Sequence, residues 1–114
     1  MIIIKLINIK LNVNLNLIFL YKKISPNQLK QDWDSRGYSF GIFKDPPRQV
    51  WADFVHKTDE LVVLAEGEIE IEIEGKSQRP TIGEEVFIPA NALHTVKNVG
   101  SRGNVWYYGY KSVS

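Results

Sequence analysis

The side chains best suited to chemistry in this 114-residue sequence are its two histidines and a glutamate close to one of them. His56 precedes Glu60 by four residues, and His94 stands in a separate segment, GEEVFIPANALHTVKN. Imidazole is the commonest side-chain metal ligand, and a carboxylate often accompanies it. A lone histidine on a strand is otherwise an ordinary core or rim residue, so the surroundings of each histidine must decide between the two roles.

Both histidines lie in frames of glycine, proline and polar residues. In the first frame His56 is followed by Glu60, and six residues separate Glu60 from Gly67. The second frame contains, in order, Gly83, Pro89, His94 and Asn98. These spacings resemble the two sequence motifs of the cupin family, a small β-barrel that often holds a metal between the two segments. The resemblance covers roughly residues 40 to 110.

The sequence departs from the cupin motifs at three places. Arg48 stands at the opening glycine place of the first motif, and Phe54 stands at its first histidine place. Asn91 stands at the second glycine place of the other motif. Asparagine tolerates a left-handed backbone better than other non-glycine residues, so a tight turn is still expected there. Phe54 removes one of the four potential metal ligands of the family.

The resemblance implies a metal site formed by His56, Glu60 and His94, which the barrel would bring together. Two imidazoles and one carboxylate suit non-haem iron(II), manganese, nickel or zinc. An open coordination position could bind water, oxygen or a chelating substrate, with the metal as Lewis acid. The family also implies a small-molecule ligand and a homodimer.

Aromatic residues are frequent on the expected strands. Small-molecule pockets are usually apolar with a few polar groups, and a small barrel is just wide enough for side chains or one small ligand. We expect Phe54, Trp106 and Tyr108 to line the pocket and Phe87 to fill the barrel.

The elements that must position these residues are mostly short strands. Residues 68–74 alternate strictly, with isoleucine predicted inward and glutamate outward. Further strands are expected at 38–43, 49–56, 60–66, 85–88, 93–98 and 104–111. Short strands without intervening helices indicate an antiparallel sandwich or closed barrel. The predicted fold class is all-β, a small antiparallel β-barrel of the cupin jelly-roll (double-stranded β-helix) type with one short N-terminal helix.

The helix is expected to begin after Ser25, where Pro26 and Gln28 complete an N-terminal capping pattern, and to cover a barrel end. Its Trp33 is expected in the core. Within residues 1–24, the stretch 7–17 alternates between apolar residues and asparagine or lysine, which predicts a strand. This segment is either an extra strand or an extension upstream of the true start. The predicted division is residues 1–24 as an N-terminal strand or extension and residues 25–114 as the barrel domain.

Composition excludes several classes of function. The net charge of +1 gives no basic footprint for nucleic acid. The sequence lacks cysteine, which removes disulfides and thiolate sites and suits a cytoplasmic location. Lysine and asparagine interrupt the N-terminal apolar run, so a membrane span is not expected.

Two functions remain open from the sequence. The first is a metal-dependent enzyme, an oxygenase or isomerase, that acts on a small organic molecule. The second is a non-catalytic module that binds a small molecule and has an incomplete metal site. Whether the protein is an enzyme is left undecided, because one fold supports many chemistries.

Overall fold

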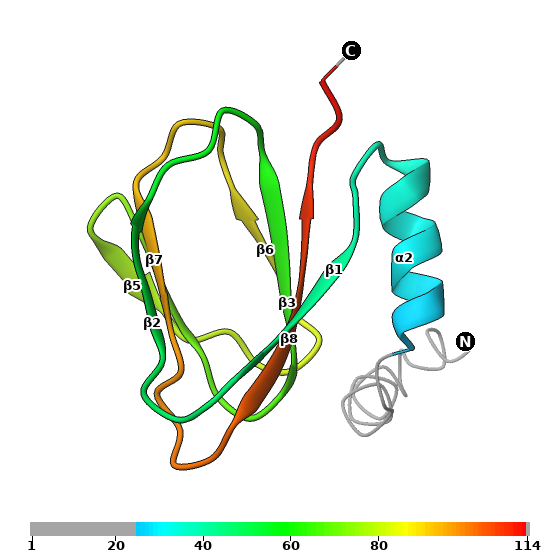
Figure 1. Ribbon diagram of the computed structural model, residues 1–114. Helices are drawn as coiled ribbons and strands as arrows, with labels where there is room; N and C mark the ends of the chain where they lie inside the picture. The colour runs from blue at the N-terminus through cyan, green and yellow to red at the C-terminus, as the bar shows by residue number, and fades with distance from the viewer. Residues whose placement is uncertain (1–24, 114) are drawn as a thin grey trace, which may run out of the picture.

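The computed structural model describes residues 25–113, which form one helix and eight strands (Figure 1). The predicted segment 1–24 lies outside the described residues. The elements are α2 (Pro26–Ser35), β1 (Gly41–Asp45), β2 (Val50–Phe54), β3 (Glu60–Glu66), β4 (Glu70–Ile73), β5 (Lys76–Gln78), β6 (Glu85–Ile88), β7 (His94–Lys97) and β8 (Asn104–Tyr110).

The strands form two antiparallel sheets that face each other across the core (Figure 1). One sheet has the strand order β1-β8-β3-β6, and the other has the order β2-β7-β4-β5. Consecutive strands often lie in opposite sheets, which is the pattern of a jelly roll. The predicted all-β fold with one short helix is therefore confirmed.

The main core lies between the two sheets and contains apolar side chains from both. Its buried members are Val62, Leu64, Ile69, Ile71, Val86, Ile88, Ala92, Val96 and Trp106. The alternation of residues 68–74 places Ile69 and Ile71 inside, as predicted. Ile73 is only half-buried but packs against the same core. The glutamates Glu70 and Glu72 are also half-buried, so this outward face is less exposed than the sequence suggested.

Helix α2 begins as predicted but packs in a different place. The Ser25 side chain accepts a hydrogen bond from the backbone N–H of Gln28, which caps the helix. Trp33 is fully buried against Leu61, Val63 and Tyr107, which lie on the outer face of the β1-β8-β3-β6 sheet. The expectation that the helix covers a barrel end is therefore wrong, because these outward side chains offer it a second apolar surface.

Several strand boundaries differ from the sequence prediction. The short strand β5 was not expected, and the first strand begins three residues later than expected, at Gly41. Strand β2 ends at Phe54 after a break in register between Trp51 and Phe54, where Asp53 has a φ of 57°. Because the strand stops there, the segment that follows is a loop and not the expected continuation to residue 56.

The turn predicted in the second motif is present. Asn91 has a φ of 68°, in the left-handed region that asparagine tolerates. At the opening glycine place of the first motif, Arg48 also has a positive φ of 69°. Within residues 25–113, no helix has the length and apolarity to cross a membrane.

Candidate metal centre

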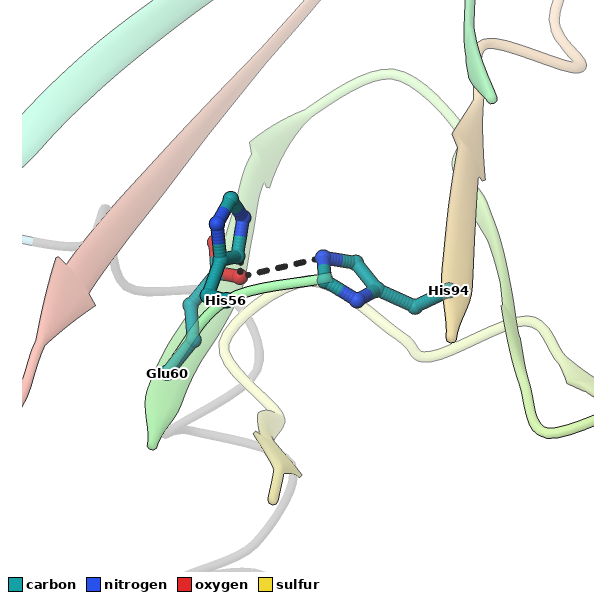
Figure 2. A group of neighbouring side chains, drawn as sticks. All are labelled: His56, Glu60 and His94. Atoms are coloured by element: carbon teal, nitrogen blue, oxygen red, sulfur yellow. Dashed lines mark ion pairs between the residues drawn. The ribbon is translucent and has the colours of Figure 1, made fainter. Parts of the chain in front are cut away.

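The three side chains predicted as metal ligands come from different parts of the fold and lie together (Figure 2). His56 is in the loop after β2, Glu60 is the first residue of β3, and His94 is the first residue of β7. One candidate ligand atom from each residue lies within 4.8 Å of the others. Two imidazoles and one carboxylate at this separation could hold a divalent metal ion.

The Glu60 carboxylate lies between the two imidazoles. Its Oε1 is 3.3 Å from His94 Nε2 and 3.6 Å from His56 Nε2. The residue is only 4% exposed, yet Oε1 has no hydrogen-bond partner. A buried carboxylate oxygen without a partner is costly, and such atoms call for an explanation in a native protein. A metal ion bound to Oε1 would supply that missing interaction.

The backbone fixes the orientation and tautomer of His94. Its Nδ1 lies 3.0 Å from the Ala92 carbonyl oxygen, which can only accept a hydrogen bond. The neutral ring must therefore carry its proton on Nδ1, and the Nε2 lone pair faces Glu60. This is the arrangement in which metal-bound histidines are usually held. Burial lowers the pKa of His94, but the Glu60 carboxylate and the Ala92 carbonyl outweigh it, so the pKa is raised overall.

A tyrosine that sequence reasoning missed completes the polar end of the site. The Tyr110 hydroxyl is 3.4 Å from His56 Nε2. Burial, followed by the negative charge of Glu60, raises the pKa of Tyr110 to about 12. The phenol therefore keeps its proton at neutral pH and can donate a hydrogen bond. The sequence feature that could have predicted this role is the alternation of the last strand, because Tyr110 has the same parity as Trp106 and Tyr108.

Phe54 lies beside both histidines. It pairs with His94 across β2 and β7, and its ring is stacked on the His56 ring with centroids 5.9 Å apart. The ring centroid of His94 is 6.3 Å away. The side chain at the first histidine place of the motif thus borders the cluster but contributes an apolar ring in place of a ligand.

A cavity of about 220 Å³ opens beside the cluster. Its walls are formed by Phe43, Trp51, Phe54, His56, Glu60, His94, Val96, Trp106 and Tyr110. Two of the expected pocket residues, Phe54 and Trp106, are among them. Tyr108 is not, and its ring is stacked on Phe43 with centroids 4.7 Å apart. The expectation that Phe87 fills the barrel is wrong, because Phe87 points outward and is 50% exposed between the buried Val86 and Ile88.

Asp45 is a second residue that the sequence did not reveal. It is buried at the end of β1, and its Oδ2 accepts hydrogen bonds from the indole N–H groups of Trp51 and Trp106, each at 2.9 Å. One carboxylate oxygen therefore holds two of the rings that line the cavity. No local pattern marks this residue, since one of its partners lies 61 residues away.

Comparison with known families covers the segment that contains these residues. The family model described as "Cupin domain" matches residues 41–108, which is more than half of the chain. The chain belongs to the cupin family. The match includes β1 to most of β8 and all three residues of the cluster. No curated protein matches the sequence of this cupin.

Solved structures share the fold of this cupin at low sequence identity. The Cupin_2 domain of an XRE family transcriptional regulator from Enterobacter cloacae is 20% identical, with a TM-score of 0.63, covering 72% of this chain and 90% of that one. An RmlC-like cupin from Shewanella frigidimarina is 14% identical, with a TM-score of 0.60 and 68% of each chain covered. Oxalate oxidase in complex with glycolate is 22% identical, with a TM-score of 0.61, covering 68% of this chain and 43% of that one.

Proposed function

We propose that this cupin binds one divalent metal ion through His56, Glu60 and His94. The observation that supports the proposal most strongly is the buried Glu60 Oε1, which has no hydrogen-bond partner and lies between two imidazole nitrogens. The Nδ1 contact of His94 with the Ala92 carbonyl leaves Nε2 free to act as a ligand. The donor set of two imidazoles and one carboxylate suits iron(II), manganese, nickel or zinc.

The bound metal would act as a Lewis acid toward an oxygen atom of a small organic molecule in the cavity. The protein's own residues would orient that molecule. Tyr110 would keep its hydroxyl proton and offer it as a hydrogen-bond donor at the polar end of the cavity. Phe54 would cover one side of the site and exclude water from it. The remaining walls would hold the apolar part of the ligand.

Two functions of such a site differ in whether the ligand is changed. In the first function the protein is a metal-dependent oxygenase or isomerase, and the cavity beside the metal cluster supports it. Binding without turnover is the second, and Phe54 at a ligand place supports it, because fewer protein ligands hold a metal less firmly. Oxalate oxidase and DMSP lyases are among the similar structures, but identities of 22% and 16% indicate the fold alone. The homodimer and cytoplasmic location expected from the sequence belong to the same proposal, and light scattering tests the first.

Metal analysis of protein purified without an affinity tag or chelator tests the proposal. We expect about one equivalent of metal in the wild type. The substitution His94→Ala should remove most of it, whereas Lys97→Ala on the same strand should leave the content unchanged. Equal metal content in His94→Ala and wild type would refute the site. Screening the loaded protein for oxygen uptake would then separate an oxygenase from a binding module.

A further inference from the structure

Trp51 and Trp106 line one end of the cavity, the aromatic end. They are held by hydrogen bonds that the metal site does not require. Trp51 comes from β2 and Trp106 from β8, in different sheets, yet both donate to the same oxygen of Asp45. The Asp45 side chain is buried, with the residue 6% exposed. Two hydrogen bonds to one buried carboxylate are charge-assisted and fix the orientation of both indoles.

Trp106 lies further along the barrel than the metal cluster does. Along β8, Tyr110 is level with Glu60, whereas Trp106 is level with Leu64. Four residues of strand separate the two levels, a distance of about 13 Å. Both ends are largely buried: Glu60 and His94 are 4% and 3% exposed at the metal cluster, and Trp106 is 3% exposed at the aromatic end. The cavity therefore has a polar end at the metal cluster and an aromatic end at Trp51 and Trp106.

The aromatic end offers a ligand no free indole hydrogen-bond donor. Both indole N–H groups are used by Asp45. The strand neighbours of the two tryptophans on the cavity wall, Phe43 and Val96, have no polar side-chain atoms. A hydroxyl or amide placed here would lose its hydrogen bonds to water without replacement, which is unfavourable. A cavity of 220 Å³ is larger than an apolar cavity of about 150 Å³ that is known to take up benzene.

We propose that this cupin takes a ligand with a ring-sized uncharged apolar group at the Asp45 end and an anionic oxygen head at the metal end. Asp45 is the positioning residue that produces the preference for an apolar ring, because it holds Trp51 and Trp106 with their N–H donors turned away from the ligand. The position of the head rests on the proposed metal site, whereas the position of the ring does not. An aryl carboxylate is the simplest molecule of this class.

Calorimetric titration with benzoate and acetate tests the preference for a ring. The two probes share a carboxylate head, and only benzoate carries a ring. In metal-loaded protein, we expect benzoate to bind at least tenfold more tightly than acetate, which corresponds to about 1.4 kcal/mol. Equal affinities would overturn the proposed ring site while leaving the metal site intact.

Titration of the metal-free protein with benzyl alcohol separates the ring site from the metal site. This probe has a ring but no anionic head. Binding of benzyl alcohol by a protein that takes up no metal would support the ring site and refute the proposed function. A protein that loads metal and binds neither benzoate nor benzyl alcohol would have the metal site only, and the ring proposal would be overturned.

Substitution of Asp45 tests its positioning role. Asp45→Ala leaves both indoles without their acceptor, and we expect the ratio of benzoate to acetate affinity to fall at least fivefold while acetate affinity stays the same. Asp45→Asn retains one acceptor oxygen and should restore most of the ratio. The control Asp34→Ala removes an exposed carboxylate on α2 and should change nothing. If Asp45→Ala does not fold, Trp51→Phe removes one of the two held indoles and should lower the same ratio. An unchanged ratio in the folded variant would refute the role of Asp45.

Discussion

Replacing Glu60 by glutamine is expected to have opposite effects on the metal-free and the metal-bound protein. In the neutral form of His94, the Nε2 lone pair lies 3.3 Å from Glu60 Oε1, because Nδ1 donates to Ala92. Two acceptors then face each other in a buried place. A glutamine amide could donate to Nε2, so Glu60→Gln would replace this repulsion with a hydrogen bond.

The size of the effect follows from the buried state of Oε1. An unsatisfied buried acceptor costs about 1–3 kcal/mol, so removing it should stabilise the metal-free protein by about 1 kcal/mol or more. For a domain of this size, each 1 kcal/mol raises the unfolding temperature by roughly 4–8 °C. The wild type, in turn, should gain about 2.7 kcal/mol from metal at a hundred times its Kd, and the variant should gain far less.

The pH dependence sharpens this prediction. Burial lowers the pKa of His94, but Glu60 and Ala92 raise it more, so its folded-state pKa lies above the ordinary value of 6.5. A histidine whose pKa is higher in the folded than in the unfolded state stabilises the fold when it is protonated. This contribution is complete below the unfolded-state pKa and is lost as the pH rises through the folded-state pKa. The wild type should therefore lose its ion pair with rising pH, and the advantage of Glu60→Gln should grow in the same direction.

Thermal unfolding followed by circular dichroism measures these differences, first with chelator and then with added metal. Glu66→Gln is the matched control, since it changes an exposed glutamate on the same strand and should leave both curves unaltered. A Glu60→Gln protein that is less stable than wild type without metal across the alkaline range would show that Oε1 is satisfied. A variant that is stabilised by metal as much as the wild type would show that Glu60 is not a ligand.

Three other substitutions test the site, the core and the surface. Phe54→His is expected to tighten metal binding by adding a third imidazole, and hence a fourth ligand, and titration with unchanged affinity would mean that this position does not reach the metal. Ile71→Ala should lower the free energy of unfolding by about 2–5 kcal/mol, since Ile71 is fully buried, whereas the exposed control Glu68→Ala should stay within about 0.5 kcal/mol; equal losses in urea denaturation would contradict the assigned faces. The hydrogen bond from Arg36 lowers the pKa of Glu85, so their pair stabilises the fold above pH 4.5 and fades as the pH falls through the lower folded pKa. Glu85→Gln should make the free energy of unfolding less dependent on pH in this range, by no more than about 1 kcal/mol for such exposed groups. An acid transition identical to that of the wild type would show that the pair does not contribute to stability.

Local patterns were sufficient to predict much of the fold. The alternation of residues 68–74 predicted the buried faces of Ile69 and Ile71, because neighbouring strand residues point to opposite sides. Ser25 and Gln28 predicted the helix start for an equally local reason, a side chain that satisfies a free N–H group. Asn91 predicted a left-handed turn. The resemblance to the cupin motifs is confirmed by the family match, while the metal ligands it implied stay a prediction.

Features that depend on contacts between distant segments could not be predicted. Asp45 stands before two prolines and is typical of a strand end, and nothing near it indicates that Trp106 will donate to it. The side on which α2 packs was equally hidden, since Trp33 could have met any apolar surface. Phe87 is a different case, because the alternation of Val86 and Ile88 was available and already predicts an outward ring.

The central position of β8 has a consequence for the order in which the chain can fold during synthesis. β8 lies between β1 and β3, and β1 has no other partner strand in its sheet. Helix α2 packs against the same region, where a Cβ on Gly109 would lie 2.7 Å from the Trp33 ring. β1 and α2 therefore cannot complete their packing until residue 110 has been made and has left the ribosome. A nascent chain halted before β8 would expose unpaired backbone along β1 and one edge of β3, which makes it a substrate for chaperones or for aggregation.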